Sequence, residues 1–388
     1  MELIEKRADL TVAHKIGYIL FSITFLVLPF YYQDNLGGEG MSLPFNAVIW
    51  IGVVGMIGLG VAQVLITGEW VKTRYLGLLS LFPLGILLSG FISGMERPGE
   101  WIIRLSVIIG GMLFWWSLLQ LRLKRRDIEN LLYLLLASML IHAMVGLIQI
   151  APEPLLKSWI PVAPGSKFLG MFQQPNLQAS LMATAAVLSL YLASTPSFKG
   201  QRWPMKALVL LTLFLSALEV VGSGSRAGLL GLSIGLVLVT LSRFNQWKRK
   251  PLWAVSLAVL IGVGAFAGTN ISGGKVVAYS KIERLAEGGR DPRPHIYQIA
   301  IDTFERAPVF GHGIGSFQRE FQNQRAIYYD PAVGETIDNA RFSHPHNELL
   351  FWAIEGGSLA LAAILAGGVA VLLQLKYVGW QRGGAMAA

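Results

Sequence analysis

A short segment rich in glycine and serine, residues 222–228, contains an arginine at the point where an apolar helix is expected to begin. We predict that Arg226 starts this helix and that Ser225 caps it, because a serine oxygen accepts the free N–H groups of a first turn. A helix N-terminus attracts anions, and a guanidinium adds charge-assisted hydrogen bonds to phosphate. The segment therefore indicates a phosphate site; the alternative is a hairpin turn whose arginine reaches the lipid headgroups.

Two histidines, an amide and a carboxylate precede the last apolar stretch: His344, His346, Asn347 and Glu348. Histidine accepts a proton near neutral pH, and a helix N-terminus beside it disfavours the imidazolium form. His346 is therefore a candidate general base. Two alternatives remain open: a zinc site, for which the sequence offers no convincing third ligand, and a pair of histidines that only cap a helix.

Three further arginines are candidate phosphate ligands. Arg293 lies one helical turn before Tyr297, which places it at the start of a predicted helix, and Arg290 closely precedes it. Arg104 lies near one end of the fourth apolar stretch. Each of these side chains can equally be an ordinary surface arginine.

Polar residues also occur next to the apolar stretches and inside them. Gln173, Gln174 and Asn176 lead into one stretch, where they can cap a helix or hold a sugar through hydrogen bonds; capping is the favoured interpretation. Within the stretches, His142 is expected to make a polar contact between helices, and Glu219 is expected to pair with an arginine.

Several kinds of site are excluded or disfavoured. The chain has no Cys, which excludes disulfides, thiolate metal sites and cysteine nucleophiles. It has no Asp-x-Asp motif and no close carboxylate pair, which disfavours metal-assisted glycosyl transfer and two-carboxylate glycoside hydrolysis. The glycine-rich residues 311–315 lack the context of a nucleotide-binding loop, so we predict a turn there. We expect neither a metal nor a cofactor.

The candidate residues must be positioned by membrane-spanning helices. Of the 388 residues, 53% are apolar and only 14% are charged, and the mean hydropathy is +0.53. A span needs about 20 apolar residues. About ten stretches qualify: 15–31, 46–66, 75–93, 101–121, 128–150, 176–195, 204–222, 226–242, 252–270 and 347–374. We predict an all-α polytopic membrane protein in which residues 1–388 form one membrane domain.

Charge determines the predicted orientation. Lysines and arginines are concentrated at the N-terminus and in alternate loops, whereas the other loops carry few. By the positive-inside rule, both termini are cytoplasmic and the long polar loop 271–346 lies on the outer face. Within this loop, apolar spacing predicts helices over 276–287 and 294–307, and another near Ser316. The net charge of +9 follows largely from this distribution, so no nucleic-acid partner is expected.

Three short motifs follow one another along the chain. Arg226 is followed by Leu230 in an Arg-x-x-x-Leu pattern, and His346 is followed by Gly357 in a His-x(10)-Gly pattern. Arg293 lies between them, ahead of the predicted glycine-rich turn. Together, these motifs resemble those of the bacterial O-antigen ligase and polymerase superfamily.

Residues 172–176 and 344–348 look most similar to the members of that superfamily that glycosylate proteins such as pilins. The resemblance implies transfer of a preassembled glycan from an undecaprenyl-diphosphate carrier to an acceptor hydroxyl at the periplasmic face of the inner membrane. The related alternatives are an O-antigen ligase, whose acceptor is lipid A-core, and an O-antigen polymerase. A transporter of lipid-linked glycans is the non-enzymatic alternative, although we see no repeated halves in the sequence.

The resemblance also implies roles for individual residues. Arg226 and Arg293, with Arg290, bind the diphosphate and stabilise the negative charge that grows on it. His346 takes the proton of the attacking hydroxyl, and a one-step displacement inverts the anomeric carbon. The residues expected to orient the imidazole are His344, Asn347 and Glu348.

Overall fold

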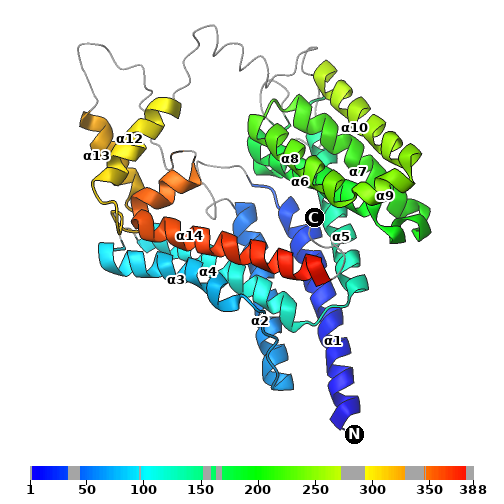
Figure 1. The fold of residues 1–388 in the computed structure, drawn as a ribbon, viewed down its shortest axis with the longest axis horizontal. Helices are drawn as coiled ribbons and strands as arrows, with labels where there is room; N and C mark the ends of the chain where they lie inside the picture. The colour runs from blue at the N-terminus through cyan, green and yellow to red at the C-terminus, as the bar shows by residue number, and fades with distance from the viewer. Residues whose placement is uncertain are drawn as a thin grey trace. The chain divides into compact units, whose positions relative to one another are not determined.

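The computed structural model describes residues 2–33, 44–95, 98–151, 159–162, 168–271, 293–327, 345 and 347–381 (Figure 1). Over these ranges the elements are all helical, apart from one isolated bridge between Met95 and Ile314. Nine of the described helices are long and apolar enough to cross a membrane, and α8 (Arg226–Ser242) is a shorter apolar helix. The prediction of an all-α polytopic membrane protein is confirmed.

Each predicted apolar stretch coincides with a helix. The first begins in α1 (Glu2–Ser22) and continues through a π-helical and a 3-10 segment to Phe30. The others, besides α8, are α2 (Pro44–Thr67), α3 (Leu76–Ser93), α4 (Pro98–Gln120), α5 (Arg125–Gln149), α6 (Pro175–Ser194), α7 (Trp203–Gly222), α10 (Pro251–Ile271) and α14 (Glu348–Gln381).

Three α-helices among the described residues lie outside these stretches. A short helix, α9 (Phe244–Arg249), connects α8 to α10. The helices expected over 294–307 and near Ser316 are confirmed as α12 (Arg293–Glu305) and α13 (Phe317–Ile327). The helix expected over 276–287 lies outside the described residues.

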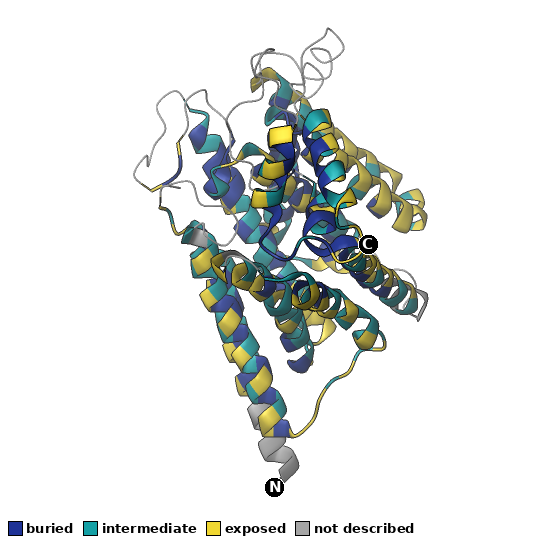
Figure 2. Cartoon of the chain, turned by 90° about the vertical axis from the view of Figure 1, so that its left-hand side faces the viewer, coloured by how far each residue is buried: buried dark blue, intermediate teal, exposed yellow. Residues whose placement is uncertain are grey.

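Many apolar side chains on the spanning helices are exposed or only partly covered, as Figure 2 shows in yellow and teal. Leu65, Phe91 and Leu252 are 78%, 78% and 83% exposed. In water, apolar surface of this extent would favour association, whereas in a bilayer the lipid chains cover it. Helices suit this environment because they satisfy their backbone hydrogen bonds internally.

The helices form two compact units. The first contains α1, α2 and α5 to α10, and its core lies where α6 and α7 pack against α5, α8 and α10. A Cβ atom added at Gly264 would lie 2.5 Å from the Phe214 carbonyl oxygen, and one at Gly268 would lie 2.3 Å from that of Leu218. Glycine therefore lets α7 and α10 approach backbone to backbone, as is common between membrane helices.

The second unit contains α3, most of α4, and α12 to α14. Helix α3 packs along α14, where a Cβ atom at Gly85 would lie 2.4 Å from the methyl group of Ala363. Helices α12 and α13 and the first turns of α14 lie side by side in Figure 1 and share a hydrophobic cluster. Its buried members are Ile296, Ile299, Ala300, Phe317, Phe321, Phe351 and Ile354. This cluster holds α12 and α13 against the start of α14.

Candidate active site

Arg226 is the first residue of α8, and Ser225 is its N-cap. The Ser225 hydroxyl oxygen accepts a hydrogen bond from the Gly228 N–H at 3.2 Å, and the side chain of Ser225 is almost completely buried. Gly224 has φ +66°, a left-handed conformation that favours glycine in the tight turn between α7 and α8. Both sequence predictions for this helix start are confirmed, and the Arg226 guanidinium is attached where the N-terminal N–H groups of α8 give partial positive charge.

The turn that carries Arg226 is packed closely against its own unit. A Cβ atom at Gly222 would lie 2.7 Å from the Phe168 ring, and one at Gly228 would lie 2.8 Å from the Ala179 methyl group. A larger side chain at either glycine would therefore move the turn away from α6 or from the segment before it. The position of Arg226 depends on these two glycines through packing.

A buried polar network lies on the helices next to this turn. Gln178 on α6 donates its amide N–H groups to a carboxylate oxygen of Glu219 at 2.7 Å and to the His142 carbonyl oxygen at 3.2 Å. Glu219 also packs directly on Gly146, where a Cβ atom would lie 2.6 Å from its Oε1 atom. The carboxylate of Glu219 thus bonds to an amide, rather than to an arginine as the sequence predicted.

The ring of His142 contacts aromatic side chains, whereas its backbone makes a polar contact. The ring lies between Phe30 and Phe172, with centroid distances of 4.6 Å and 5.1 Å. Its carbonyl oxygen supplies the polar contact to α6 through Gln178. The expected polar contact between helices is therefore present, but it is made by the main chain.

Gln149 fixes the segment that leads into α6. Its side-chain oxygen accepts the N–H groups of Leu169 and Gly170, both at 2.9 Å. Its amide nitrogen donates to the carbonyl oxygens of Pro161 at 2.7 Å and Gly170 at 3.0 Å. A single buried amide thereby satisfies four backbone groups in a stretch with little regular structure, as buried polar groups require.

The three polar residues at the start of α6 are not the side-chain caps that we predict from the sequence. Gln174 occupies the N-cap position but makes no side-chain capping hydrogen bond, and Asn176 lies within the first turn of α6. Gln173, with φ +57°, donates its amide N–H to the Gln33 carbonyl oxygen at 3.0 Å. The capping interpretation is wrong for Gln174, and Gln173 ties the loop to the end of the first span.

In the second unit, three candidate residues lie at helix N-termini. Arg293 is the first residue of α12 and is exposed. Asn347 precedes α14, and its side-chain oxygen accepts the N–H groups of Leu349 at 3.0 Å and Leu350 at 3.2 Å. Glu348, the exposed first residue of α14, adds a carboxylate beside this helix N-terminus, where negative charge is stabilising. The cap of this helix is therefore the asparagine.

The glycine-rich residues 311–315 form the predicted turn, and the structure shows that this turn packs beside α14. The His312 N–H donates to the Ile354 carbonyl oxygen at 2.8 Å, and the Gly313 N–H donates to that of Glu355 at 3.0 Å. These carbonyl groups are available because α14 is interrupted at Gly357, which has φ +63° and ψ −163°. Gly357, the glycine of the His-x(10)-Gly pattern, is thus the residue at which α14 is interrupted and the turn packs against it.

We expect Gly357→Ala to destabilise the protein by about 2 kcal/mol or more, because a Cβ atom would combine left-handed strain with a clash. That Cβ atom would lie 2.4 Å from the backbone of Val309. Thermal unfolding of the purified protein in detergent measures the change. Gly368→Ala is the matched control, since it lies on the same helix with open space at its Cβ position. Equal stability of the two variants would contradict this role for Gly357.

Arg104 has a protein partner in the second unit. Its guanidinium forms an ion pair with the fully buried carboxylate of Glu355 and lies 4.6 Å from the centre of the Phe351 ring. The same carboxylate accepts the Phe317 N–H at 3.1 Å, at the start of α13. Glu355 therefore links α4, the end of the glycine-rich turn and α14. Sequence analysis missed this residue, although a carboxylate inside an apolar stretch is itself a signal of a buried partner.

We expect Glu355→Ala to lower the free energy of unfolding by about 3 kcal/mol, because it leaves Arg104 and the Phe317 N–H without their buried partner. Thermal unfolding in detergent is again the measurement. Glu348→Ala removes an exposed carboxylate from the same helix and is expected to change stability far less. An unchanged melting temperature in Glu355→Ala would show that this ion pair does not hold the turn in place.

The predicted residues are distributed over both units. Arg226, Gln173, Gln174, Asn176 and Ser225 belong to the first; Arg293, Arg104, Asn347 and Glu348 belong to the second. Arg290, His344 and His346 lie outside the described residues. Over the described ranges, no three His, Asp or Glu side chains lie close enough to hold a metal ion together.

Comparison with known proteins bears on the part of the chain that contains Arg226 and Arg293. No curated protein and no solved structure is significantly similar to the chain. Residues 211–365, from within α7 to within α14, match a family model described as O-antigen ligase. The matched range includes Arg226, Arg293, His346 and Gly357. Residues 211–365, less than half of the 388 residues, therefore form an O-antigen ligase domain, which places this part of the chain in the O-antigen ligase and polymerase superfamily of lipid-linked glycan transferases.

Proposed function

We propose that this protein transfers a preassembled glycan from an undecaprenyl-diphosphate carrier to a serine or threonine hydroxyl of a periplasmic acceptor protein such as a pilin. The observation that carries the diphosphate donor in this proposal is the position of Arg226, at a capped helix N-terminus inside the range that matches the O-antigen ligase family. The protein acceptor rests on the resemblance of residues 172–176 and 344–348 to the ligases that glycosylate proteins. Partial positive charge and a guanidinium at one helix start are suited to a diphosphate. We place the protein in the bacterial inner membrane, with both termini cytoplasmic and the site on the periplasmic face.

The reaction is a displacement at the anomeric carbon of the first sugar. The acceptor oxygen forms a bond to that carbon while the bond from carbon to the diphosphate oxygen breaks, and the electron pair leaves with the diphosphate. Arg226 and Arg293, with Arg290, stabilise the charge on the leaving group. His346 takes the proton from the acceptor hydroxyl, with His344, Asn347 and Glu348 as the residues that orient it. A single displacement gives inverted configuration.

We expect glycan transfer to continue unchanged in EDTA. In the proposed mechanism, arginine side chains and helix N–H groups stabilise the leaving diphosphate, a task that a divalent ion performs in many other transferases. The measurement is the rate of transfer by purified protein, with donor and acceptor also treated with chelator. A loss of activity that Mg²⁺ or Mn²⁺ restores would overturn the metal-independent mechanism.

The acceptor is identified by comparing two acceptor substrates in separate reactions. Purified protein in proteoliposomes receives one lipid-linked glycan donor and either a pilin-type protein or lipid A-core. Glycosylation of serine or threonine in the protein supports the proposal. The description of the matched family favours the second candidate, an O-antigen ligase, for which the product would instead be glycan attached to lipid A-core. Extension of the glycan on its own carrier would identify a polymerase.

A further inference from the structure

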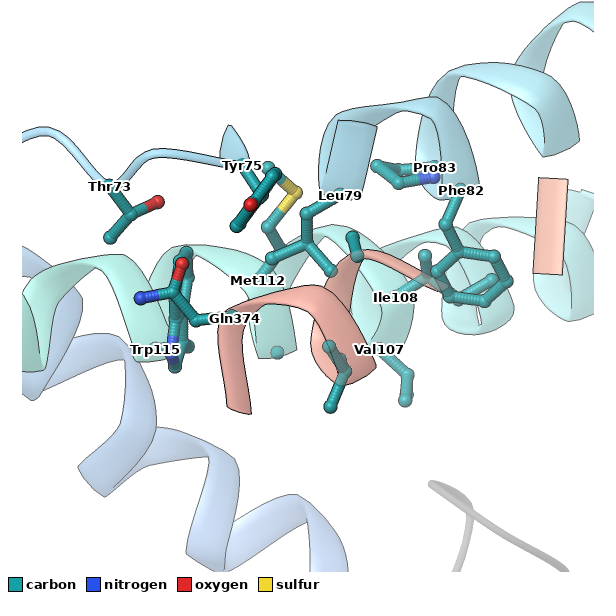
Figure 3. A pocket seen from close by; sticks show the side chains of 13 residues that line it. Thr73, Tyr75, Leu79, Phe82, Pro83, Val107, Ile108, Met112, Trp115 and Gln374 are labelled. Atoms are coloured by element: carbon teal, nitrogen blue, oxygen red, sulfur yellow. The ribbon is translucent and has the colours of Figure 1, made fainter. Parts of the chain in front are cut away.

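The second unit contains an apolar cavity of about 630 Å³ between α3, α4 and α14. Its size lies within the range of about 300–1,000 Å³ that is typical of sites for small ligands. Figure 3 shows side chains from the three helices converging on it. The apolar residues that define its walls include Leu79, Phe82, Ile108, Met112, Trp115 and Val371. A cavity with such walls accepts a hydrocarbon chain more readily than a polar ligand.

The cavity is polar at one end only. Thr73, Tyr75 and Gln374 lie at the end where α3 begins, next to Trp115, whereas Phe82 lies at the far end (Figure 3). Tyrosine and tryptophan are enriched where the hydrocarbon core of a membrane meets the headgroups. The cavity therefore has the polarity of a single lipid molecule, with its headgroup end at the start of α3.

Basic residues lie close in the sequence to the residues of the polar end. Lys72 and Arg74 flank Thr73 in the sequence, Lys376 follows Gln374 by two residues, and all three are exposed. The Arg74 guanidinium lies 4.8 Å from the centre of the Tyr377 ring, which brings it to the end of α14. Basic sites beside membrane helices attract anionic headgroups.

The cavity is shallow enough to lie within one leaflet of a bilayer. From Leu76, where α3 begins, to Pro83, which lines the cavity, the helix rises by about 10 Å, and a leaflet contributes about 15 Å of hydrocarbon. By the positive-inside rule the basic end faces the cytoplasm, away from the face where we place the glycan donor. This site is therefore independent of the proposed transfer reaction.

We propose that this cavity binds one acyl chain of an anionic phospholipid, and that Arg74 binds its phosphate group. The ligand is identified by two complementary features: a hydrocarbon chain for the apolar walls, and negative charge for the basic end. The lipid fills the space between α3 and α14 and holds their ends together where the direct packing of the two helices leaves a gap.

The test is binding of phosphatidylglycerol to the full-length protein in detergent, counted by native mass spectrometry. Gly111→Phe is designed to fill the cavity, because Gly111 lines it and a Cβ atom there meets nothing within 4 Å. Gly262→Phe is the matched control, a glycine of α10 that also has open space at its Cβ position. We expect at least tenfold weaker binding in Gly111→Phe and no change in Gly262→Phe. Gly111→Leu, a smaller replacement, serves the same purpose if the phenylalanine variant does not fold.

The charge is tested separately. Arg74→Glu is expected to weaken phosphatidylglycerol binding at least tenfold, whereas Arg202→Glu, an exposed arginine of the first unit, leaves it unchanged. Phosphatidylcholine is expected to bind at least tenfold more weakly than phosphatidylglycerol. Equal binding of the two lipids, undiminished binding to Gly111→Phe, or displacement of phosphatidylglycerol by an uncharged polyprenol would each overturn the proposal. The last result would identify the cavity as a site for the carrier chain.

Discussion

Replacing Arg226 by alanine is expected to reduce glycan transfer by about 10²–10³-fold, the loss typical of removing one group that stabilises transition-state charge. The effect is large because Arg226 stands at the N-terminus of α8, where its guanidinium adds to the partial charge of the helix. The same substitution is expected to weaken binding of the diphosphate-linked donor. Both quantities are measured with purified protein: initial rates of transfer, and binding of a non-reactive lipid diphosphate.

One further variant separates charge from geometry at this position, and another serves as a control. Arg226→Lys keeps the charge but lacks the planar fork, so we expect activity between those of wild type and alanine. Arg202→Ala removes an arginine that precedes α7 and makes no side-chain capping hydrogen bond there, and it is expected to retain full activity. Wild-type activity in Arg226→Ala, with Arg202→Ala also active, would remove Arg226 from the mechanism.

Replacing His346 by alanine is expected to reduce the rate of transfer by about 10²–10⁴-fold, the contribution typical of a general base. The effect of this replacement on donor binding is expected to differ from that of replacing Arg226, because the base acts on the acceptor hydroxyl and not on the diphosphate. We therefore expect donor binding to stay at the wild-type value while the turnover rate falls. Initial rates at saturating donor and acceptor, together with binding of the non-reactive lipid diphosphate, make this comparison.

His344→Ala provides the internal contrast, two residues away in the same segment. An orienting residue acts through His346, so its loss is expected to lower the rate less than the loss of His346 itself. Thermal unfolding of both variants checks that each remains folded. A transfer rate that is unchanged in His346→Ala would show that another group takes the proton.

The spans and the helix start at Arg226 were predictable because they depend on local sequence. A spanning helix follows from the need to satisfy backbone hydrogen bonds in lipid, so a long apolar stretch has few alternatives. The cap of α8 follows from a serine before an apolar run, and the structure confirms it with the hydrogen bond to Gly228. The start of α12 at Arg293 followed in the same way from apolar spacing.

Contacts between distant parts of the chain were not predictable from one sequence. Glu355 pairs with a residue 251 positions earlier, and Gln178 meets Glu219 across 41 positions. No periodicity or motif indicates which arginine or amide will face a buried carboxylate. The insertion of the glycine-rich turn beside Gly357 is equally non-local. The break in α14 frees backbone groups, and the turn, which is distant in the sequence, supplies their hydrogen-bond partners.

The most direct test of the account is a density map of the protein with a non-reactive polyprenyl diphosphate bound. The account predicts diphosphate density within hydrogen-bonding distance of the Arg226 guanidinium and the first N–H groups of α8, with His346 facing the anomeric carbon. A diphosphate bound elsewhere, out of reach of the Arg226 side chain, would contradict it.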